Sequence, residues 1–455
     1  MRIYNTLTKK LDEFVPVRDN RVGFYMCGMT VQDRPHLGHL RTFTTGDIVR
    51  RYLIYRGYEV TYVTNFTDID DKIIKKSHDL GIDWRKIGET YIEEFFRVTD
   101  EINIMRADYY PRATQFIQEI IESVEVLVKK GYAYEAGGDV WFDVRKKADY
   151  GKLSGKKLED LMEGARVEPS PNKRFPMDFA VWKAWKEGEP YWWSPWGKGR
   201  PGWHIECSVM STHFLGQPFD IHGGAQDLIF PHHENEIAQS EAIRDTEYVR
   251  YWLHGGFVNI RGEKMSKSTG LFFTAEEVLN RYGANPVRLY FLQTHYRSPI
   301  DFSAERLEES RKAWERIENF LLKLPEERGN ETDFAHFGDY LKRFEEAMDE
   351  DFNTPRAVAV IFDLVRLGNQ LIDSDPERAR EAGRVLKLIL HVLGFKPVEK
   401  KKAGIEEDLI NIIIEVRQKM RKEKKFEIAD WIRDQLKNLG VILEDTPEGT
   451  IFRIR

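Results

Sequence analysis

The chain has 455 residues, of which 41% are hydrophobic and 32% charged, so it can form roughly three structural units and lacks the composition of a disordered protein. Two cysteines are too few for a disulfide scaffold, and no window approaches the ~20 apolar residues of a membrane helix, so we expect a cytoplasmic protein with neither a membrane nor a DNA partner. The net charge of −6 argues against a polyanion partner, but residues 396–455 hold 14 basic and 12 acidic side chains. That tail permits local phosphate binding, or is simply a solvated helix face.

The first ~110 residues have the pattern of an opening parallel α/β sheet. The apolar run 22–26 predicts a strand, residues 27–30 break it, and a helical pattern extends from Pro35 to Tyr55. Residues 58–65 predict a second strand, and helices follow from Ile73. This alternation indicates a Rossmann-type sheet.

Residues 111–200 have a different character. They contain two helical patterns and an aromatic strand at 140–142, and six of the eleven tryptophans lie between Trp182 and Trp203. We interpret this segment as an insertion that splits the sheet domain. The sheet then resumes near Gly202 and includes 219–221 and 257–260.

Long amphipathic patterns beyond Ser303 predict a helical bundle, and the tail predicts helices at 406–423 and 426–439 with short strands near 441–443 and 451–452. The predicted fold class is α/β: a parallel-sheet domain split by an insertion, an α-helical bundle and a small α+β C-terminal domain. The predicted boundaries are 1–110 and 201–260 for the two halves of the sheet domain, 111–200 for the insertion, 261–302 for a lysine loop and the region after it, 303–395 for the bundle and 396–455 for the tail.

The string His36-Leu37-Gly38-His39 lies where a helix is predicted to begin. A helix N-terminus offers backbone N–H groups to phosphate, and the glycine allows close approach of a nucleotide. Alone the pattern is weak, because two histidines at a helix start are more often structural or merely exposed.

A second string, Gly262 to Gly270, contains Lys264-Met265-Ser266-Lys267-Ser268 between flanking glycines. Two lysines three residues apart can follow a pyrophosphate as negative charge develops on it. The alternative is a solvated basic loop.

In this order, across a split sheet, the two strings resemble the paired signatures of class I aminoacyl-tRNA synthetases. Four further stretches resemble cysteinyl-tRNA synthetases specifically, and this similarity spans nearly the whole chain. They are Tyr25-Met26-Cys27-Gly28, Asn65 to Lys72, Gly202-Trp203-His204-Ile205-Glu206-Cys207, and His222-Gly223-Gly224 through Pro231-His232-His233-Glu234-Asn235-Glu236.

The resemblance implies one zinc ion per chain, bound by Cys27, Cys207, His232 and Glu236. Two thiolates, an imidazole and a carboxylate suit zinc, and His232 and Glu236 are four apart, so both would project from one helix face. His233, rotated by about 100°, is the poorer candidate. Without the resemblance, two lone cysteines are more often small buried hydrophobes.

Zinc would give this family its amino-acid selectivity. Contacts alone separate substrates that differ by one small group only about 10- to 200-fold, whereas a soft metal strongly prefers a thiolate to a hydroxyl. Four protein ligands usually mark a closed structural site, so the substrate would either add to the ligands or displace one of them.

By the same resemblance the substrates are L-cysteine, ATP with Mg²⁺ and tRNA(Cys), and the reaction forms cysteinyl-adenylate before transfer to the tRNA. The carboxylate of cysteine is already ionised, so positioning and charge stabilisation should dominate. Asp68, Asp70 and Asp71 are interpreted as structural. The implied site residues are His36, His39, Lys264 and Lys267 for catalysis, these four with Gly38, Gly224 and Asp227 for ATP, and Thr67 and Trp203 for cysteine.

In the tail, Arg421, Phe426, Asp430 and Asp445 occupy positions similar to those of the family's anticodon-binding helix. An aromatic ring can stack on an unpaired base, and carboxylates accept hydrogen bonds from base amino groups. The family more often has tryptophan where Phe426 stands. Generic helix charge is the alternative.

Departures from the family pattern occur at Met29, Gln32, Leu40 and Thr269, beside the expected active site. They bear on rates more than on reaction class, because every residue assigned a chemical role is present. One rival is the cysteine ligase of mycothiol synthesis, which needs no anticodon-reading tail. The other is a non-catalytic synthetase paralogue, which the intact histidines and lysines disfavour.

Overall fold

A computed structural model of the chain describes residues 1–158, 160, 170–260, 263–264, 273–325, 334, 336–398, 405–446 and 449–454. The chain forms two compact units, residues 1–397 and residues 398–455. Within the described ranges, every helix is too short or too polar to cross a membrane.

A parallel four-stranded sheet is the centre of the first unit. Its strand order is β11-β10-β3-β4, so two strands precede the insertion and two follow it, as predicted. Burial on both faces explains the nearly continuous apolar run at 22–26 of β3, whereas the other three strands carry buried polar residues among the apolar ones. The strands are β3 (Arg21–Thr30), β4 (Glu59–Thr67), β10 (Phe219–Ala225) and β11 (Val249–Gly255).

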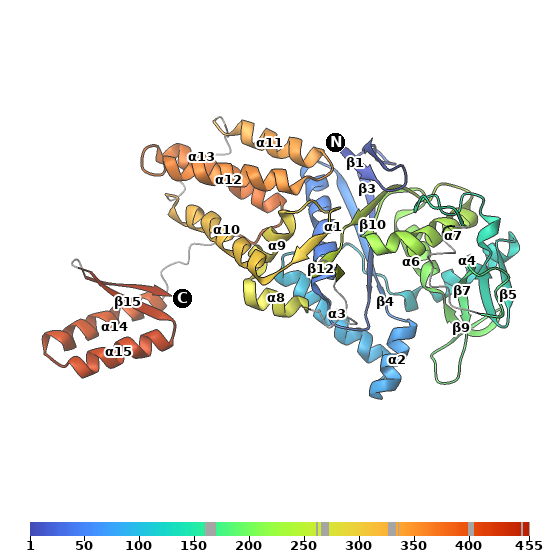
Figure 1. Cartoon of the computed structure of the whole chain (residues 1–455), viewed down its shortest axis with the longest axis horizontal. Coiled ribbons are helices and arrows are strands. Elements are labelled where there is room, and N and C mark those ends of the chain that lie inside the picture. Colours follow the sequence, from blue (N-terminus) through green and yellow to red (C-terminus); the bar gives the residue numbers. More distant parts are fainter. Residues whose placement is uncertain are drawn as a thin grey trace. The chain divides into compact units, whose positions relative to one another are not determined.

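Helices cover both faces of this sheet. Gly46 of α1 packs close to Met26 and Tyr62 of the sheet, and Gly23 of β3 packs close to Leu215 of α6. Gly23 and Met26 are three residues apart on one strand and so face opposite sides of the sheet. Helices α1 and α6 therefore cover opposite faces. Figure 1 shows α6 and α7 on the side of the insertion and α1 on the side of the helical bundle. The helices are α1 (Leu37–Tyr55), α2 (Asp71–Leu80), α3 (Trp84–Glu101), α6 (Trp203–Leu215) and α7 (Glu234–Arg244).

The insertion contains more strand than predicted. Besides α4 (Ile117–Lys129), it forms an antiparallel sheet of order β5-β6-β7-β9-β8. The sequence indicated only the strand at 140–142, because the strands are short and their tryptophans do not alternate cleanly with polar residues. They are β5 (Ala133–Ala136), β6 (Asp139–Phe142), β7 (Phe179–Ala184), β8 (Trp192–Ser194) and β9 (Gly197–Pro201).

One predicted strand belongs to a different sheet. Residues 257–260 were expected in the central sheet, but β12 (Val258–Ile260) pairs with β13 (Glu263–Lys264) and β14 (Ile300–Phe302). The fourth central strand is β11, whose mixed polar pattern gave no clear signal. A small hairpin, β1 (Arg2–Asn5) and β2 (Lys10–Glu13), was also not predicted.

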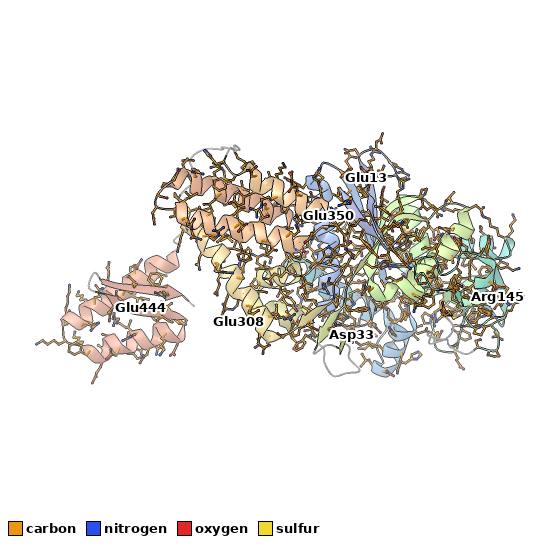
Figure 2. All side chains as sticks on the ribbon, turned by 45° about the horizontal axis from the view of Figure 1, so that its top comes forward. Glu13, Asp33, Arg145, Glu308, Glu350 and Glu444 are labelled. Carbon is orange, nitrogen blue, oxygen red and sulfur yellow. The ribbon has the colours of Figure 1, made fainter. Side chains whose placement is uncertain are left out.

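Short helices and the predicted bundle complete the first unit. Asn353 and Asp375 cap bundle helices through their side chains. Figure 2 labels Glu350, where the bundle meets the N-terminal segment and Arg2 Nη2 lies 2.7 Å from Glu350 Oε1. The helices are α8 (Ala275–Tyr282), α9 (Ala284–Leu292), α10 (Ala304–Lys323), α11 (Gly338–Asp349), α12 (Thr354–Leu371) and α13 (Pro376–Val392).

The second unit has the predicted α+β composition. Ile410, Ile414 and Leu436 pack with the hairpin around a small core. Buried Arg417 donates to both oxygens of Asp445 at 3.0 Å. The elements are α14 (Ile405–Lys422), α15 (Phe426–Asn438), β15 (Val441–Thr446) and β16 (Gly449–Ile454).

Candidate active site and metal centre

A break in the register of β3 positions the first thiol. The pairing of β3 with β4 shifts between Met26 and Met29, so Cys27 and Gly28 form a bulge. A Cβ on Gly28 would lie 1.5 Å from the carbonyl oxygen of Asn65, so only glycine fits there. The Gly28 N–H donates to Asn65 Oδ1 at 2.9 Å, which fixes the bulge. The sequence Cys-Gly thus re-aims one side chain at the end of a buried strand.

The second thiol comes from α6, and the two sulfurs meet. Cys27 Sγ and Cys207 Sγ are 3.9 Å apart and both residues are buried. That is far longer than a disulfide of about 2.05 Å. Two sulfurs bound to one tetrahedral zinc at about 2.3 Å lie about 3.8 Å apart. The observed spacing fits a shared metal ion.

His232 and Glu236 complete the predicted set. Their Nε2 and Oε1 atoms are 2.9 Å apart, and the donor atoms of all four residues lie within 4.8 Å of one another. Both side chains are fully buried or nearly so. The structure therefore brings the four predicted ligand residues together.

His233, predicted to be the poorer candidate because a regular helix would rotate it by about 100°, also reaches this cluster. Its Nε2 lies 3.2 Å from Cys27 Sγ, and Cys27, His222, His233 and Glu236 form a second, overlapping group of possible ligands. The prediction assumed one regular α-helix through this segment. Instead, Ile229–His233 form a wider turn before α7 begins at Glu234.

A further layer of hydrogen bonds, which the sequence did not reveal, orients these side chains. His222 Nε2 and Tyr248 Oη lie 2.8 and 3.1 Å from Glu236 Oε2, leaving Oε1 toward the sulfurs. His204 Nδ1 lies 2.8 Å from His232 Nδ1. Such partners fix the orientation of metal ligands. Each comes from a different element, so no local pattern marks them.

The charges of the cluster are tightly linked. Burial raises the pKa of Cys27 well above its usual value, and the neighbouring Cys207 and Glu236 raise it further. The hydrogen bond that Cys27 donates to Cys207 has the opposite effect on its partner and lowers the pKa of Cys207 to about 6. Against the effect of burial, Glu236 raises the pKa of His232 to about 10, and His222 and His232 hold the pKa of Glu236 well below its usual value. A bound divalent cation would favour loss of the proton from the Cys27 thiol and the neutral form of the His232 imidazole.

His36 and His39 sit at the start of α1, as predicted, but their own backbone N–H groups and that of Leu37 already donate hydrogen bonds within the protein. His36 N donates to His39 Nδ1 at 3.2 Å and His39 N donates to His36 Nδ1 at 3.3 Å, and the rings stack with centroids 3.6 Å apart. Accepting at Nδ1 places the ring proton on Nε2. Burial and neighbouring His36 lower the pKa of His39 well below its usual value. Each ring therefore offers an Nε2–H donor in place of the backbone N–H of its own residue, and Gly38 lies between the two histidines in the first turn.

The residues on both sides of the lysine loop are paired with other strands or loops, and those that follow it lie beside these histidines. Lys264 lies in β13, paired with Asn259, and Thr274 bridges to His36. Leu37 N donates to Phe273 O at 3.3 Å and Ala275 N donates to Pro35 O at 2.9 Å. The Lys264 side chain and all of Lys267 lie outside the described residues. The backbone nevertheless attaches residues 273–275, which follow the loop, to the start of α1.

Trp203 connects the cluster to a cavity. Its ring stacks on His232, with centroids 4.3 Å apart at 26°, and is 38% exposed. Trp203 and His204 line a cavity of about 940 Å³ that extends to Lys183 and Arg200 of the insertion. Thr67 is buried at the end of β4, beside Glu206. Trp203 is therefore accessible from solvent, whereas Thr67 is buried.

Gly224 and Asp227 lie at the carboxyl end of β10, where nucleotides bind in open parallel sheets. A Cβ on Gly224 would lie 2.8 Å from the His233 ring, so the glycine allows the metal-cluster turn to approach the strand. Its role is thus at least partly structural. Asp227 is exposed.

The aspartates after β4 support the structural interpretation. Asp68 accepts from Thr114 N and Thr114 Oγ1 at 3.0 and 2.6 Å, and Asp70 caps α2. Asp71 pairs with Lys183 and Arg200 of the insertion.

The predicted anticodon residues are on the surface of the second unit. Phe426 is 56% exposed at the start of α15, and Asp430 is exposed on the same helix. Asp445 is held by Arg417 and by Arg421, whose Nη1 lies 2.8 Å from Asp445 Oδ2. The sequence reasoning missed Trp431, which is 62% exposed, although a tryptophan in a polar helix was a visible signal.

Comparisons with known proteins agree with this geometry. The family model described as tRNA synthetases class I (C) catalytic domain matches residues 13–312, and the DALR domain model matches residues 343–396. The cysteine–tRNA ligase of Thermococcus gammatolerans is 49% identical over 470 residues, covering 100% of this chain and 99% of that protein. That of Thermotoga maritima is 48% identical over 465 residues, covering 100% of both chains.

Solved structures show the same fold at low identity. Mycobacterium tuberculosis methionyl-tRNA synthetase with methionyl-adenylate has a TM-score of 0.62 at 15% identity and covers 82% of this chain and 91% of its own. The LeuRS–tRNA–LeuAMS ternary complex from Agrobacterium radiobacter K84 has a TM-score of 0.60 at 13% identity, covering 84% and 85%.

Proposed function

Because the chain belongs to the cysteine–tRNA ligase family, we propose that it activates cysteine with ATP, transfers it to tRNA(Cys), and selects the amino acid through a zinc ion bound by Cys27, Cys207, His232 and Glu236. The observation that carries the zinc proposal is the convergence of the four buried donors, with the two sulfurs 3.9 Å apart. The proposal keeps the cytoplasmic location expected from the sequence.

A zinc ion held there would coordinate the thiolate of cysteine and discriminate against the hydroxyl of serine. The protein's part is to hold the ligands: Glu236 through His222 and Tyr248, and His232 through His204 and the stacked Trp203. With these partners in place, neither ligand side chain needs to reorganise when substrate arrives.

For activation, a carboxylate oxygen of cysteine attacks the α-phosphorus of ATP, and the bond from that phosphorus to the pyrophosphate oxygen breaks. His36 and His39 would donate their Nε2–H groups to the phosphates, since both Nδ1 atoms already accept backbone hydrogen bonds. Lys264 and Lys267 would stabilise the negative charge of the departing pyrophosphate, to which the Mg²⁺ of the ATP substrate would stay bound. Support comes from the attachment of residues 273–275, which follow the loop, beside His36.

In the remainder of the active site, Gly38 would allow ATP to approach α1, and Gly224 and Asp227 would face the nucleoside at the end of β10. Trp203 would cover the bound cysteine, with Thr67 in the wall beside it.

In the second unit, Arg421, Phe426 and Asp430 would contact the anticodon, with Trp431 added as a second stacking surface. Asp445 would act mainly by fixing Arg421. A tail with exposed aromatic and basic side chains favours a tRNA substrate over the sugar substrate of the mycothiol-type ligase.

The test measures cysteine-dependent ATP–pyrophosphate exchange, charging of tRNA and metal content on one preparation. We expect exchange, charging and about one zinc per chain. Exchange without charging would favour the sugar ligase, and the absence of exchange would leave only the non-catalytic paralogue.

A further inference from the structure

Asn65, near the end of β4, is a buried polar residue that contacts both the metal cluster and Thr67. It is only 1% exposed. Burying a side-chain amide costs free energy unless its oxygen and its NH2 group both find hydrogen-bond partners. The described part of the chain supplies a partner on each side of this amide, and the partners belong to different parts of the site.

The amide oxygen of Asn65 supports the bulge that carries the first thiol. The pairing of β3 with β4 resumes on either side of the bulge, so Asn65 is the single β4 residue opposite Cys27 and Gly28. A bulge leaves a backbone group of the strand without its partner in the ladder. Asn65 Oδ1 accepts the N–H of Gly28 at 2.9 Å and so replaces that partner. The direction of the Cys27 side chain therefore depends on the Asn65 amide.

The same oxygen also contacts the second thiol. Asn65 Oδ1 lies 3.8 Å from Cys207 Sγ of α6. One amide oxygen thus touches the bulge that carries Cys27 and the sulfur of Cys207, although the two cysteines come from different elements. A displacement of Asn65 would disturb the positions of both sulfurs.

The amide nitrogen of Asn65 extends to Thr67. Asn65 Nδ2 donates to Thr67 Oγ1 at 3.4 Å, and the two residues project from the same side of β4 because they are two apart. The Thr67 hydroxyl also hydrogen-bonds to the side chain of buried Glu206, so two partners fix its direction. A side-chain amide is planar and stiff for the same resonance reason as a peptide bond. Asn65 therefore holds the sulfur ligands and Thr67 at a set separation.

Asparagine is the residue type that this position needs. Aspartate would keep the acceptor for the Gly28 N–H, but it has no donor for Thr67 and would add a negative charge beside two thiols and Glu236. Glutamine has both groups but places them one methylene farther from the strand. Only asparagine combines the donor, the acceptor and the length.

This separation matters because the amino acid has to fit at both ends. Its thiol end lies in the metal cluster, whereas a carboxylate oxygen at its other end attacks the α-phosphorus of ATP. An amino acid with one more methylene before the sulfur would have its carboxylate displaced by about 1 Å, and a misplacement of that size can lower a rate about 100-fold. The distance from the sulfur ligands to the rest of the pocket thus selects the length of the substrate.

We propose that Asn65 is a positioning residue that fixes the distance between the sulfur ligands and Thr67, and so restricts activation to an amino acid with a single methylene between Cα and thiol. The inference rests on the proposed function, because it assumes that the metal cluster holds the substrate thiol. Asn65 acts through Gly28 and Thr67 and does not need to touch the substrate.

The test measures ATP–pyrophosphate exchange with cysteine and with homocysteine, whose side chain is one methylene longer. It compares the zinc-loaded unmodified chain with Asn65→Ala and Asn65→Asp. We expect both variants to lower kcat for cysteine about 100-fold with little change in KM, because the thiol end stays bound while the carboxylate is misplaced. The preference for cysteine over homocysteine in kcat/KM should fall about tenfold, within the range that one methylene controls.

Zinc affinity, measured by chelator competition, separates the two ends of the amide independently of activity. Asn65→Asp keeps the acceptor for the Gly28 N–H and should bind zinc as the unmodified chain does, whereas Asn65→Ala should bind it about tenfold more weakly. Asn285→Ala is the matched control, because the Asn285 amide of α9 also donates and accepts, bonding the Lys396 backbone at 3.1 and 2.8 Å. It should leave exchange, selectivity and zinc affinity unchanged.

Two results would overturn the inference. Equal losses of exchange with cysteine and with homocysteine in Asn65→Ala would mean that Asn65 only stabilises the fold. Unmodified kcat and selectivity in both variants would mean that the link to Thr67 has no part in activation, while exchange by the unmodified chain would leave the proposed function in place. If Asn65→Ala did not fold, the same comparison on Asn65→Asp would decide. Absence of exchange in the unmodified chain would overturn the proposed function and this inference with it.

Discussion

The metal cluster of the first unit and the helix surface of the second unit are built in opposite ways. Around Glu236 the histidines, cysteines and tyrosine are buried, and hydrogen bonds link them across four elements. On α14 and α15, by contrast, Leu409, Ile412, Phe426 and Trp431 are each more than half exposed. A small substrate is read by a preorganised interior, whereas a large one is read by an accessible surface. Substitutions in the metal cluster should therefore impair both cysteine activation and tRNA charging, whereas substitutions on the surface of α14 and α15 should impair only charging.

The largest effect is expected from Cys207→Ser. Losing a ligand should reduce zinc affinity and cysteine-dependent exchange together by more than about 100-fold, because loss of an outer partner alone typically costs about 10- to 100-fold. Metal analysis and pyrophosphate exchange measure the two effects. Val209→Ala, a core truncation on the same helix, is the control and should retain zinc. Full zinc occupancy in Cys207→Ser would refute the metal assignment.

A smaller loss is expected from His222→Gln, which leaves all four ligands but weakens the hold on Glu236 Oε2. Zinc affinity, measured by chelator competition, should fall about 10- to 100-fold. The KM for cysteine should rise with it. His391→Gln, at an exposed histidine of the bundle, is the matched control. An unchanged zinc affinity would mean that the hydrogen bond from His222 does not orient Glu236 for the metal and that His222 serves only to fill the interior.

On the other side of the comparison, Phe426→Ala and Trp431→Ala should each raise the KM for tRNA about tenfold, because each removes a surface on which a base can stack. Exchange should stay within about twofold of the unmodified chain. Leu439→Ala, at a more exposed side chain of the same unit, is the control. Equal losses in exchange and charging would break the distinction between the two regions.

The smallest effect is expected from Asp445→Asn, which leaves buried Arg417 without a carboxylate. Arg417 holds the pKa of Asp445 well below its usual value, so the pairing stabilises the folded unit above the unfolded pKa of about 3.9 and fades as pH falls through the folded pKa. The variant's second unit should thus melt a few degrees lower near pH 7, and the difference should shrink in acid. A pH-independent difference would point to packing instead of charge.

Local patterns in the sequence determined much of this protein. The amphipathic repeats beyond Ser303 and the two tail helices were predictable because their stability depends on neighbours three and four residues away. The strand at 22–26 was predictable because burial on both faces makes it nearly continuously apolar, and the strand at 58–65 because it is rich in β-branched and aromatic residues. Residues Cys27, Cys207, His232 and Glu236 were identified by resemblance, and the structure brings them together.

Tertiary structure decided the rest, because it depends on contacts between elements far apart in sequence. His222, Tyr248 and His204 acquire their roles only when β10, the loop before β11 and α6 meet around α7, and nothing local distinguishes them from other polar residues. The wider turn at 229–233 brought His233 into the cluster. The reciprocal capping of His36 and His39 moved their donor groups from backbone to ring. Sequence supplies the chemical groups, but their directions are set by packing, since a side chain's partner is whatever the fold places beside it.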